Sequence, residues 1–334
     1  MNKKPLLDIN LITWQGENYL GKLLQSIFNQ SFKDFSLLII DNNSSDNTVS
    51  FLKENYPQVK VINNKINLGF AKAHNQAINW TAGKYVLCLN QDTVLEKNFL
   101  KNALAFMEKN SEAAAITGKI LVWDYQNNLP TKQIDSLGLK ILKNHRVLDR
   151  GQGETDTGQY EEINEVFGVS GAAPIFRREV LEKLKYNYEY FDENFFSYKE
   201  DVDLAFRLKL GGYKTFYLPK AIIYHQRSSG LSINSASKHL RSRRRRNKYI
   251  NYHSYKNHFF VLLKNEFLLN VLKYFPWLVA YELKKLFYLL FFEQRTLKSF
   301  GEIIRLLPLM LKKRKYIKKN ITLIKPTELG QWYE

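Results

Sequence analysis

Two apolar segments of this sequence each run into an aspartate. Residues 35–40 lead into Asp41, and residues 85–89 lead, a few positions later, into Asp92. In an open α/β sheet the ligand lies outside the carboxyl ends of the strands, so two such carboxylates can face one pocket. Carboxylates there can accept hydrogen bonds from a nucleotide base or a sugar, or bind a metal ion.

A third acidic cluster, Glu200, Asp201 and Asp203, lies later in the chain and is followed by His225. Residues 191–210 predict an acidic loop entering a helix, so at least one of these acids is expected to stabilise the helix N-terminus. A carboxylate in a pocket can also serve as a general base, and neighbouring like charges raise its pKa. His225 ends a predicted strand, where it could ligate a metal ion or simply pack as a histidine.

The elements around these residues alternate between strands and helices, which is typical of a parallel, wound α/β sheet. Between residues 124 and 165 the chain is polar and Gly-rich, which predicts a long surface excursion. The predicted strands are 6–13, 35–40, 59–63, 85–89 and 215–224, and the predicted helices are 17–30, 98–109 and two shorter ones ending near Phe51 and Trp80.

The charge is very unevenly distributed along the 334 residues. The net charge is +18, and residues 238–334 alone carry 22 Lys/Arg against 6 Asp/Glu. We therefore divide the chain into an α/β domain, 1–237, and a basic helical region, 238–334, whose partner must be anionic. Aromatic and aliphatic clusters alternate with lysines in this region, which suits amphipathic helices on an anionic membrane surface. No stretch reaches the ~18 uncharged apolar residues of a spanning helix.

The cysteine content and the N-terminus indicate the compartment. Cys88 is the only cysteine and lies in an apolar run, as expected of a buried residue in a reducing environment. Asp8 and Asn10 interrupt the first apolar stretch, so it predicts a strand and not the core of a signal peptide. We expect the protein to act on the cytoplasmic side of the membrane.

Several short motifs, taken in order over roughly residues 6–235, resemble the inverting family 2 glycosyltransferases of the GT-A fold. The closest resemblance is to bacterial rhamnosyltransferase-like members. It implies a mixed, mainly parallel α/β sheet with helices on both faces, followed here by the helical region. Each motif is weak alone, and their joint order is specific. The motifs are Thr13-Trp14-Gln15-Gly16, Asp41-Asn42-Asn43-Ser44-Ser45-Asp46, Asn67-Leu68-Gly69-Phe70-Ala71, Leu89-Asn90-Gln91-Asp92-Thr93, Ser170-Gly171-Ala172-Ala173, Tyr198-Lys199-Glu200-Asp201-Val202-Asp203-Leu204, and His225 with Ser228-Ser229.

The resemblance implies roles for the two strand-end aspartates. Asp41 would accept a hydrogen bond from the imide N–H of uracil or thymine; the alternative is that it caps the turn at Ser44, and both roles can coexist. Asp92 matches the last acid of the family's metal motif, whose first acid is replaced here by Asn90. Asp92 and His225 would then hold Mg²⁺ or Mn²⁺ together with diphosphate oxygens and water.

The resemblance also implies a base and a pocket. Asp201 is the expected general base that deprotonates the acceptor hydroxyl, with Glu200 as the alternative. Gly171 and Ala172 would form the floor under the sugar and acceptor, or else serve only tight backbone packing. The other expected contacts to the nucleotide donor are Thr13, Asn43, Asn67, Gly69, Asn75, Asn90 and Gln91.

The implied function is metal-dependent, inverting transfer of a sugar, expected to be L-rhamnose from dTDP-rhamnose. The expected acceptor is a glycan linked to polyprenyl diphosphate, at the cytoplasmic face of the plasma membrane, in synthesis of a surface polysaccharide such as O-antigen or capsule. A UDP-hexose donor is the nearest alternative. Nucleic-acid binding through Arg241–Arg246 is disfavoured, because the clusters of the basic region are too hydrophobic and the acids would be unexplained. A nucleotidyltransferase is disfavoured because residues 13–18 contain no Lys or Arg for a triphosphate.

Overall fold

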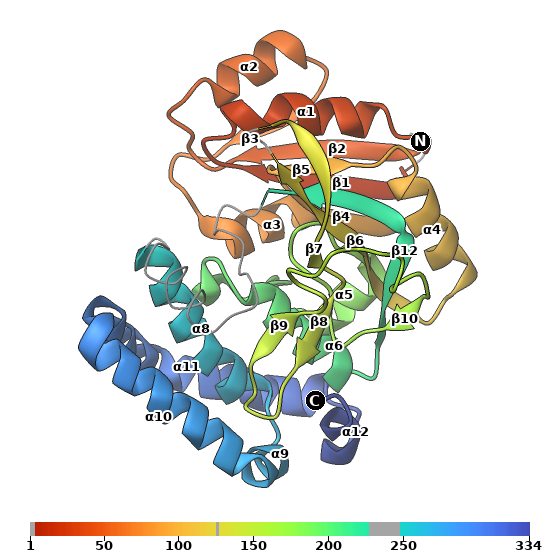
Figure 1. Cartoon of the computed structure of the whole chain (residues 1–334). Coiled ribbons are helices and arrows are strands. Elements are labelled where there is room, and N and C mark those ends of the chain that lie inside the picture. Colours follow the sequence, from red (N-terminus) through yellow and green to blue (C-terminus); the bar gives the residue numbers. More distant parts are fainter. Residues whose placement is uncertain (1–3, 125–126, 227–247) are drawn as a thin grey trace.

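The computed structural model of this chain describes residues 4–124, 127–226 and 248–334 (Figure 1). The Ser228-Ser229 motif and the Arg241–Arg246 run lie outside the described residues. The described strands are β1 Leu7–Thr13, β2 Phe35–Asp41, β3 Lys60–Asn63, β4 Tyr85–Asn90, β5 Thr93–Leu95, β6 Ala113–Asp124, β7 Leu129–Ser136, β8 Leu139–Ile141, β9 Val147–Asp149, β10 Asn164–Glu165, β11 Ile175–Arg177 and β12 Lys214–His225. The described helices are α1 Glu17–Phe28, α2 Thr48–Asn55, α3 Gly69–Trp80, α4 Phe99–Lys109, α5 Arg178–Leu184, α6 Glu200–Leu210, α8 Lys248–Asn265, α9 Leu268–Lys273, α10 Phe275–Phe292, α11 Ser299–Asn320 and α12 Pro326–Gly330, with short 3₁₀ turns η1 Glu193–Phe195 and η2 Gln294–Lys298.

One mixed sheet runs through the molecule in the order β10-β12-β6-β11-β4-β1-β2-β3. Strands β3, β2, β1 and β4 are mutually parallel, so their carboxyl ends meet at one edge. The register pairs Thr13 with Asp41 and Ile12 with Asn90. The strand ends that carry the predicted site therefore lie side by side.

Helices cover both faces of the sheet, which confirms the predicted fold class (Figure 1). The apolar stripe of α1, at Leu20, Leu23, Leu24 and Ile27, is fully buried and packs in one core with residues of α4. Helices α3, α5 and α6 contribute to the core on the other face. Both cores form because the helices carry apolar residues at a spacing of about 3.6, which gives each helix an apolar side that packs against an apolar face of the sheet.

The prediction of a surface excursion over residues 124–165 was wrong for much of that segment. Strand β7 pairs with β6, and β8 pairs with β9 in a separate hairpin. Ile134, Asp135, Ser136 and Leu137 are buried. The sequence analysis also missed β6, the long strand that precedes them. The Gly and polar residues that suggested a loop belong to turns between short strands, where composition alone does not reveal burial.

The helices after residue 248 are not a separate layer. Phe260 and Val261 of α8 and Met310 and Ile317 of α11 are buried in the same core as residues of α6. No helix among the described residues is long and apolar enough to cross a membrane. The division at 237–238 stays a prediction, but part of the basic region is built into the α/β domain's core.

Candidate active site

Gln91 joins the ends of β1 and β4. Its Oε1 accepts hydrogen bonds from Thr13 Oγ1 at 2.6 Å and from the backbone N–H of Trp14 at 2.9 Å. Its Nε2 donates to the carbonyl oxygen of Trp14 at 2.9 Å. Gln91 and Thr13, both predicted to contact the donor, therefore also shape the sheet edge where the donor is expected.

Asp41, at the end of β2, is buried and uses its two oxygens differently. Oδ2 accepts the backbone N–H of Ser44 at 3.0 Å, which is the predicted turn cap. Oδ1 is buried and has no hydrogen-bond partner among the described residues. Leaving a buried acceptor unpaired costs about 1–3 kcal/mol. Oδ1 thus suits an incoming N–H donor, as the predicted base contact requires, while Oδ2 holds the turn.

Strand pairing brings Asp92 to His225. Strand β5 follows Asp92 directly and pairs antiparallel with β12, with Thr93 opposite His225. Asp92 Oδ1 then lies 3.2 Å from His225 Nε2. On the other side of the ring, His225 Nδ1 lies 2.8 Å from Oδ2 of the buried Asp135. The sequence analysis missed Asp135 because it lies in the segment interpreted as a surface excursion.

The Asp92–His225 pair has a geometry that fits a divalent cation. Two ligands that each lie ~2.1 Å from one metal ion at right angles are about 3 Å apart, close to the separation seen here. Asp135 on Nδ1 matches the usual arrangement in which a metal-binding histidine gives its other N–H to a carboxylate. No cluster of three or more His, Cys, Asp or Glu suited to a metal occurs within residues 4–124, 127–226 and 248–334. Asp92 and His225 are thus the two ligands that the described residues would supply, together with oxygens of phosphate and water.

Without a cation, the same carboxylates hold a proton on His225. Burial alone would lower the pKa of His225, but Asp92 and Asp135 outweigh it and raise this pKa to about 10. A metal ion on Nε2 would take the place of that proton, since only a neutral imidazole nitrogen binds a metal.

The two candidate bases differ in exposure. Glu200 is buried, and its Oε2 has no hydrogen-bond partner among the described residues. Asp201 is partly exposed and accepts the backbone N–H of Val202 at 2.8 Å and of Gly171 at 3.1 Å. Burial and the charge of Asp149 raise the pKa of Asp201 above its ordinary value. Burial, then Asp201, raise the pKa of Glu200 well above its own.

Gly171 and Ala172 connect the candidate base to the sheet edge. The carbonyl of Ala172 accepts the backbone N–H of Asn90 at 2.9 Å, and Gly171 donates to Asp201 as described. A Cβ added at Gly171 would lie 3.3 Å from Asp201 Oδ2. These contacts place Asp201 near the end of β4, and a side chain at residue 171 would crowd it.

The 67–75 segment is occupied mainly by contacts within the protein. Gly69 has φ +78°, and a Cβ there would come within 2.6 Å of the carbonyl oxygen of Phe196. Asn67 Oδ1 accepts the backbone N–H of Gly69 at 2.8 Å. The packing of Phe196 against residue 69 therefore explains the glycine there, and the predicted contact between Gly69 and the donor stays a prediction. Asn43 is exposed with φ 66°, and its predicted donor contact stays a prediction.

Asn75 lies inside the fold. Its Nδ2 donates to Phe191 O at 2.8 Å and to Glu193 Oε1 at 3.3 Å. Its Oδ1 accepts the backbone N–H groups of Tyr190 and Phe191. The amide is fully used in holding residues 190–193, which leaves the predicted donor contact without a free group.

The loop before Asp201 is strained and is held by α8. Phe196, Tyr198 and Lys199 all have φ between 62° and 71°, a backbone conformation that is unfavourable for residues other than glycine. Nδ2 of the buried Asn257 lies 2.7–3.0 Å from the carbonyl oxygens of Phe195, Ser197 and Tyr198. The sequence analysis missed this contact, because no local pattern relates residue 257 to residue 201.

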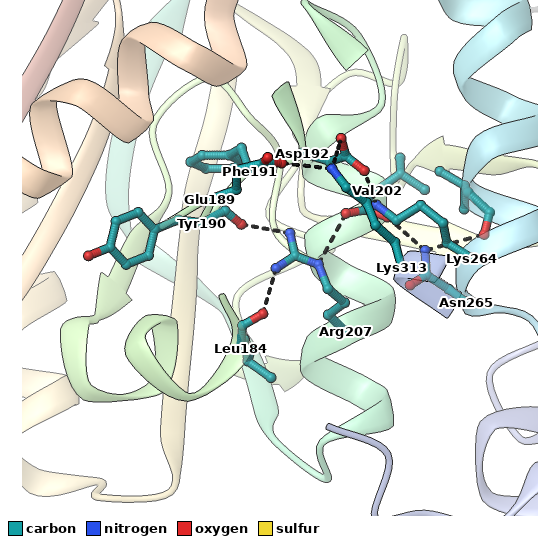
Figure 2. Close-up of polar contacts among 12 residues, drawn as sticks. Leu184, Glu189, Tyr190, Phe191, Asp192, Val202, Arg207, Lys264, Asn265 and Lys313 are labelled. Atoms are coloured by element: carbon teal, nitrogen blue, oxygen red, sulfur yellow. Dashed lines mark hydrogen bonds and ion pairs between the residues drawn. The ribbon is translucent and has the colours of Figure 1, made fainter. Parts of the chain in front are cut away.

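A buried network of charges connects α6 and Asp192 to α8 and α11 (Figure 2). Lys264 of α8 lies 2.6 Å from Asp192 Oδ2 and 2.7 Å from Asp203 Oδ1. Lys313 of α11 lies 2.7 Å from Asp192 Oδ1, and Arg207 pairs with Asp203 at 3.1 Å. Asp203, expected near the catalytic acids, therefore serves to join α6 to the C-terminal helices.

Comparison with known proteins identifies the family of this chain. The Glycosyl transferase family 2 domain matches residues 8–185, which is more than half of the chain. The chain belongs to Glycosyl transferase family 2. This confirms the family and the class of enzyme predicted from the sequence, a glycosyltransferase, while the rhamnosyltransferase-like subgroup stays a prediction.

Relatives resemble parts of the chain. An uncharacterized glycosyltransferase of Haemophilus influenzae is 28% identical over 35% of this chain and 37% of its own length. The poly-beta-1,6-N-acetyl-D-glucosamine synthase of Staphylococcus epidermidis is 25% identical over 60% of this chain and 45% of its own. The chain thus spans less than half the length of these relatives. The crystal structure of GalNAc-T7 with UDP, GalNAc and Mn²⁺ has a TM-score of 0.58 at 13% identity, over 78% of this chain and 48% of that one, so it shares the GT-A fold.

Proposed function

We propose that this chain transfers a sugar from a nucleotide diphosphate to a glycan with inversion at the anomeric carbon. The observation that carries the proposal is the arrangement at one edge of the sheet. There, Asp41 Oδ1 is a buried acceptor without a hydrogen-bond partner among the described residues, and Asp92 lies in contact with His225. In a family 2 domain these groups suit the base and the diphosphate of one donor. The Staphylococcus epidermidis relative, named as a polysaccharide synthase, supports a glycan acceptor.

Each residue has a defined task in the proposed reaction. Asp41 Oδ1 accepts the imide N–H of the base and so orients the nucleotide. Asp201, the more exposed of the two acids, takes the proton of the acceptor hydroxyl as that oxygen attacks the anomeric carbon. Its raised pKa makes it a stronger base than an ordinary aspartate. Gln91 connects the ends of β1 and β4 at this site, and the backbone N–H of Gly171 holds the carboxylate of Asp201.

Asp92 and His225 would hold a divalent cation, Mg²⁺ or Mn²⁺, on the diphosphate. The cation would balance the negative charge of the leaving group. The 3.2 Å separation of the two ligating atoms and the Asp135 contact support this assignment, as does the presence of Mn²⁺ with UDP in the GalNAc-T7 crystal structure. Asp92 would supply a carboxylate oxygen to the cation, and Asp135 would orient the histidine.

The proposal extends to the donor, the acceptor and the cellular location of the enzyme. The donor is dTDP-rhamnose, with a UDP-hexose as the alternative, and support comes from the order of the motifs. The acceptor is a glycan on polyprenyl diphosphate, reached from the cytoplasmic face of the membrane by a peripheral protein. The excess of cations in residues 238–334 supports an anionic lipid surface as the partner rather than a nucleic acid.

A thermal-shift and calorimetry panel of nucleotide sugars tests the donor site. We expect dTDP-rhamnose with Mn²⁺ or Mg²⁺ to raise the unfolding temperature, and Asp41→Ala and Asp92→Ala to lose that response. Glu112→Gln, at an exposed ion pair remote from these strand ends in sequence, is the matched control and should respond like the parent chain. If every dTDP- and UDP-sugar leaves the parent chain unchanged, the proposed donor site is refuted.

A further inference from the structure

Helices α9 and α10 expose many of their large apolar side chains. Helices of a water-soluble protein normally bury apolar side chains and expose polar ones. In α9, Leu268, Leu269 and Leu272 are exposed by 59–65%, whereas Asn270 is buried and donates to the carbonyl of Pro326. The short helix thus turns its polar side chain inward and its leucines outward.

Helix α10 buries Leu289 but likewise exposes apolar side chains. On its inner side, Glu282 accepts a hydrogen bond from His258 Nε2 at 2.9 Å, and Lys285 lies over the ring of Tyr255. On its outer side, Leu283 and Phe287 are exposed by 61% and 60%. Positions 283, 287, 290 and 291 follow helical spacing and share one side. Figure 1 shows α8 on the side of α10 that faces the sheet.

Nine exposed apolar side chains of these two helices make up what we call the α9–α10 face. Exposed apolar side chains that are grouped together and flanked by charges are typical of an interaction site. Its members are Leu268, Leu269, Leu272, Phe275, Trp277, Leu283, Phe287, Leu290 and Phe291.

The charges around the α9–α10 face are cationic. Lys273, Lys284, Arg295 and Lys298 are all exposed. The two acids between residues 268 and 298 are engaged within the protein: Glu282 with His258, and Glu293 with Thr296 Oγ1 at 2.5 Å. The face therefore presents an apolar centre with a basic rim.

We propose that the α9–α10 face is the surface by which this protein binds an anionic lipid bilayer. Apolar and aromatic side chains between lysines lie at the boundary of headgroups and acyl chains, while the cations meet lipid phosphate. A second copy of the chain fits less well, because a two-fold contact through this face would bring lysines against lysines. This proposal rests on the proposed membrane location. It assigns the contact with the lipid to α9 and α10, because α8 and α11 contribute buried residues to the core.

Flotation of the full chain with vesicles tests the proposal without any sugar substrate. We expect the parent chain to float with phosphatidylcholine vesicles that contain phosphatidylglycerol, and much less with phosphatidylcholine alone. The variant Leu283→Glu/Phe287→Glu should lose roughly a hundredfold in partitioning, because burying each side chain is worth about tenfold or more. The matched control is Ile163→Glu/Tyr188→Glu, at exposed apolar residues off this face, and it should float like the parent chain.

A second measurement does not depend on how the charged variant folds. Brominated lipids should quench part of the tryptophan emission of the parent chain, and Trp277→Phe should remove that part. Undiminished flotation of the folded double variant, or quenching unaffected by Trp277→Phe, would overturn the proposal. The proposal would also be overturned if the parent chain forms a dimer without lipid and does not float, while the double variant is a monomer. Asp92→Ala should float normally, so a failed donor site and a failed membrane surface give separate results.

Discussion

At the scale of single residues, the site depends on carboxylates that are placed differently by their surroundings. Asp41 is a buried acceptor with one oxygen that no described residue pairs, and Asp92 and Asp135 hold the two sides of one imidazole. Asp201 is partly exposed beside the end of β4, whereas Glu200 is buried. In the proposed reaction the same type of side chain would provide base recognition, metal binding, positioning and proton transfer, because burial and neighbouring groups give each carboxylate a different environment.

Asp135→Asn tests the positioning of His225. We expect a loss of about 10–100-fold in Mn²⁺ affinity, because the histidine loses the carboxylate that orients its ring. Calorimetry with Mn²⁺ and nucleotide diphosphate measures this without turnover. Asp156→Asn, which removes an acid from the same region that pairs with Lys119, is the control and should leave Mn²⁺ affinity unchanged. Equal affinities for the Asp135 variant and the parent chain would contradict the assignment.

Asp201→Asn tests the base. Turnover should fall by about 10²–10⁴-fold while donor binding persists, since only proton abstraction is removed. A base works when deprotonated, and the pKa of Asp201 is raised by burial and by Asp149. The rate of the parent chain should therefore fall on the acid side at a pH above the ordinary pKa of an aspartate, ~3.9. A steady-state pH profile of the parent chain checks this. A Glu200→Gln variant that loses as much turnover, with Asp201→Asn active, would reverse the assignment.

At the scale of elements, the strand ends and the loop before α6 are positioned by segments far away in sequence. Strand β5 brings Asp92 to β12, and α8 holds the loop whose residues adopt left-handed backbone angles. Such strained backbone persists only where surrounding contacts determine it. The C-terminal region therefore contributes to the shape of the candidate active site.

Asn257→Asp tests the contact between α8 and this loop. It would turn a carboxylate toward three carbonyl oxygens, so we expect kcat to fall with little change in donor affinity, and a loss of about 1–3 kcal/mol in the free energy of unfolding. Kinetics with denaturant unfolding separates the two effects. Asn320→Asp is the matched control, because its amide bonds only the carbonyl of Tyr316 at the exposed end of α11. An unchanged kcat in the folded Asn257 variant would remove Asn257 as a positioning residue.

At the scale of the whole molecule, the α/β domain and the C-terminal helices share one core and one buried charge network. Removing the chain beyond residue 237 would take away Lys264 and Lys313 and leave Asp192 and Asp203 buried without these cations. Breaking a buried pair on one side typically costs about 3–5 kcal/mol. The role of the basic region is therefore better tested by substitutions on the α9–α10 face than by truncation.

Asp192 makes stability depend on pH. Burial alone would raise the pKa of Asp192, but Lys264 and Lys313 outweigh it and hold this pKa well below its usual range. A folded-state pKa below the unfolded value gives stability that is complete above the unfolded pKa, ~3.9, and is lost as the pH falls below it. Denaturant unfolding at several pH values should show this loss. Asp192→Asn should lower stability by about 3–5 kcal/mol near neutral pH and flatten the acid limb.

Glu112→Gln is the control for this prediction. Its ion pair with Lys214 is half-exposed, so the substitution should change stability by less than about 1 kcal/mol. A pH profile of Asp192→Asn as steep as that of the parent chain would show that other groups govern acid unfolding.

The sequence by itself determined the α/β fold class, the family and the strand-end acids, because these depend on local patterns. Apolar runs that end in Asp41 and Asp92 need only neighbouring residues to be recognised, and parallel strands bring such ends to one edge. The tertiary structure alone decided that Asp135 contacts His225, that Asn257 holds the loop before Asp201, and which apolar side chains of α10 are exposed. These depend on pairing between segments tens of residues or more apart, and composition does not encode which side of a strand or helix finds a partner.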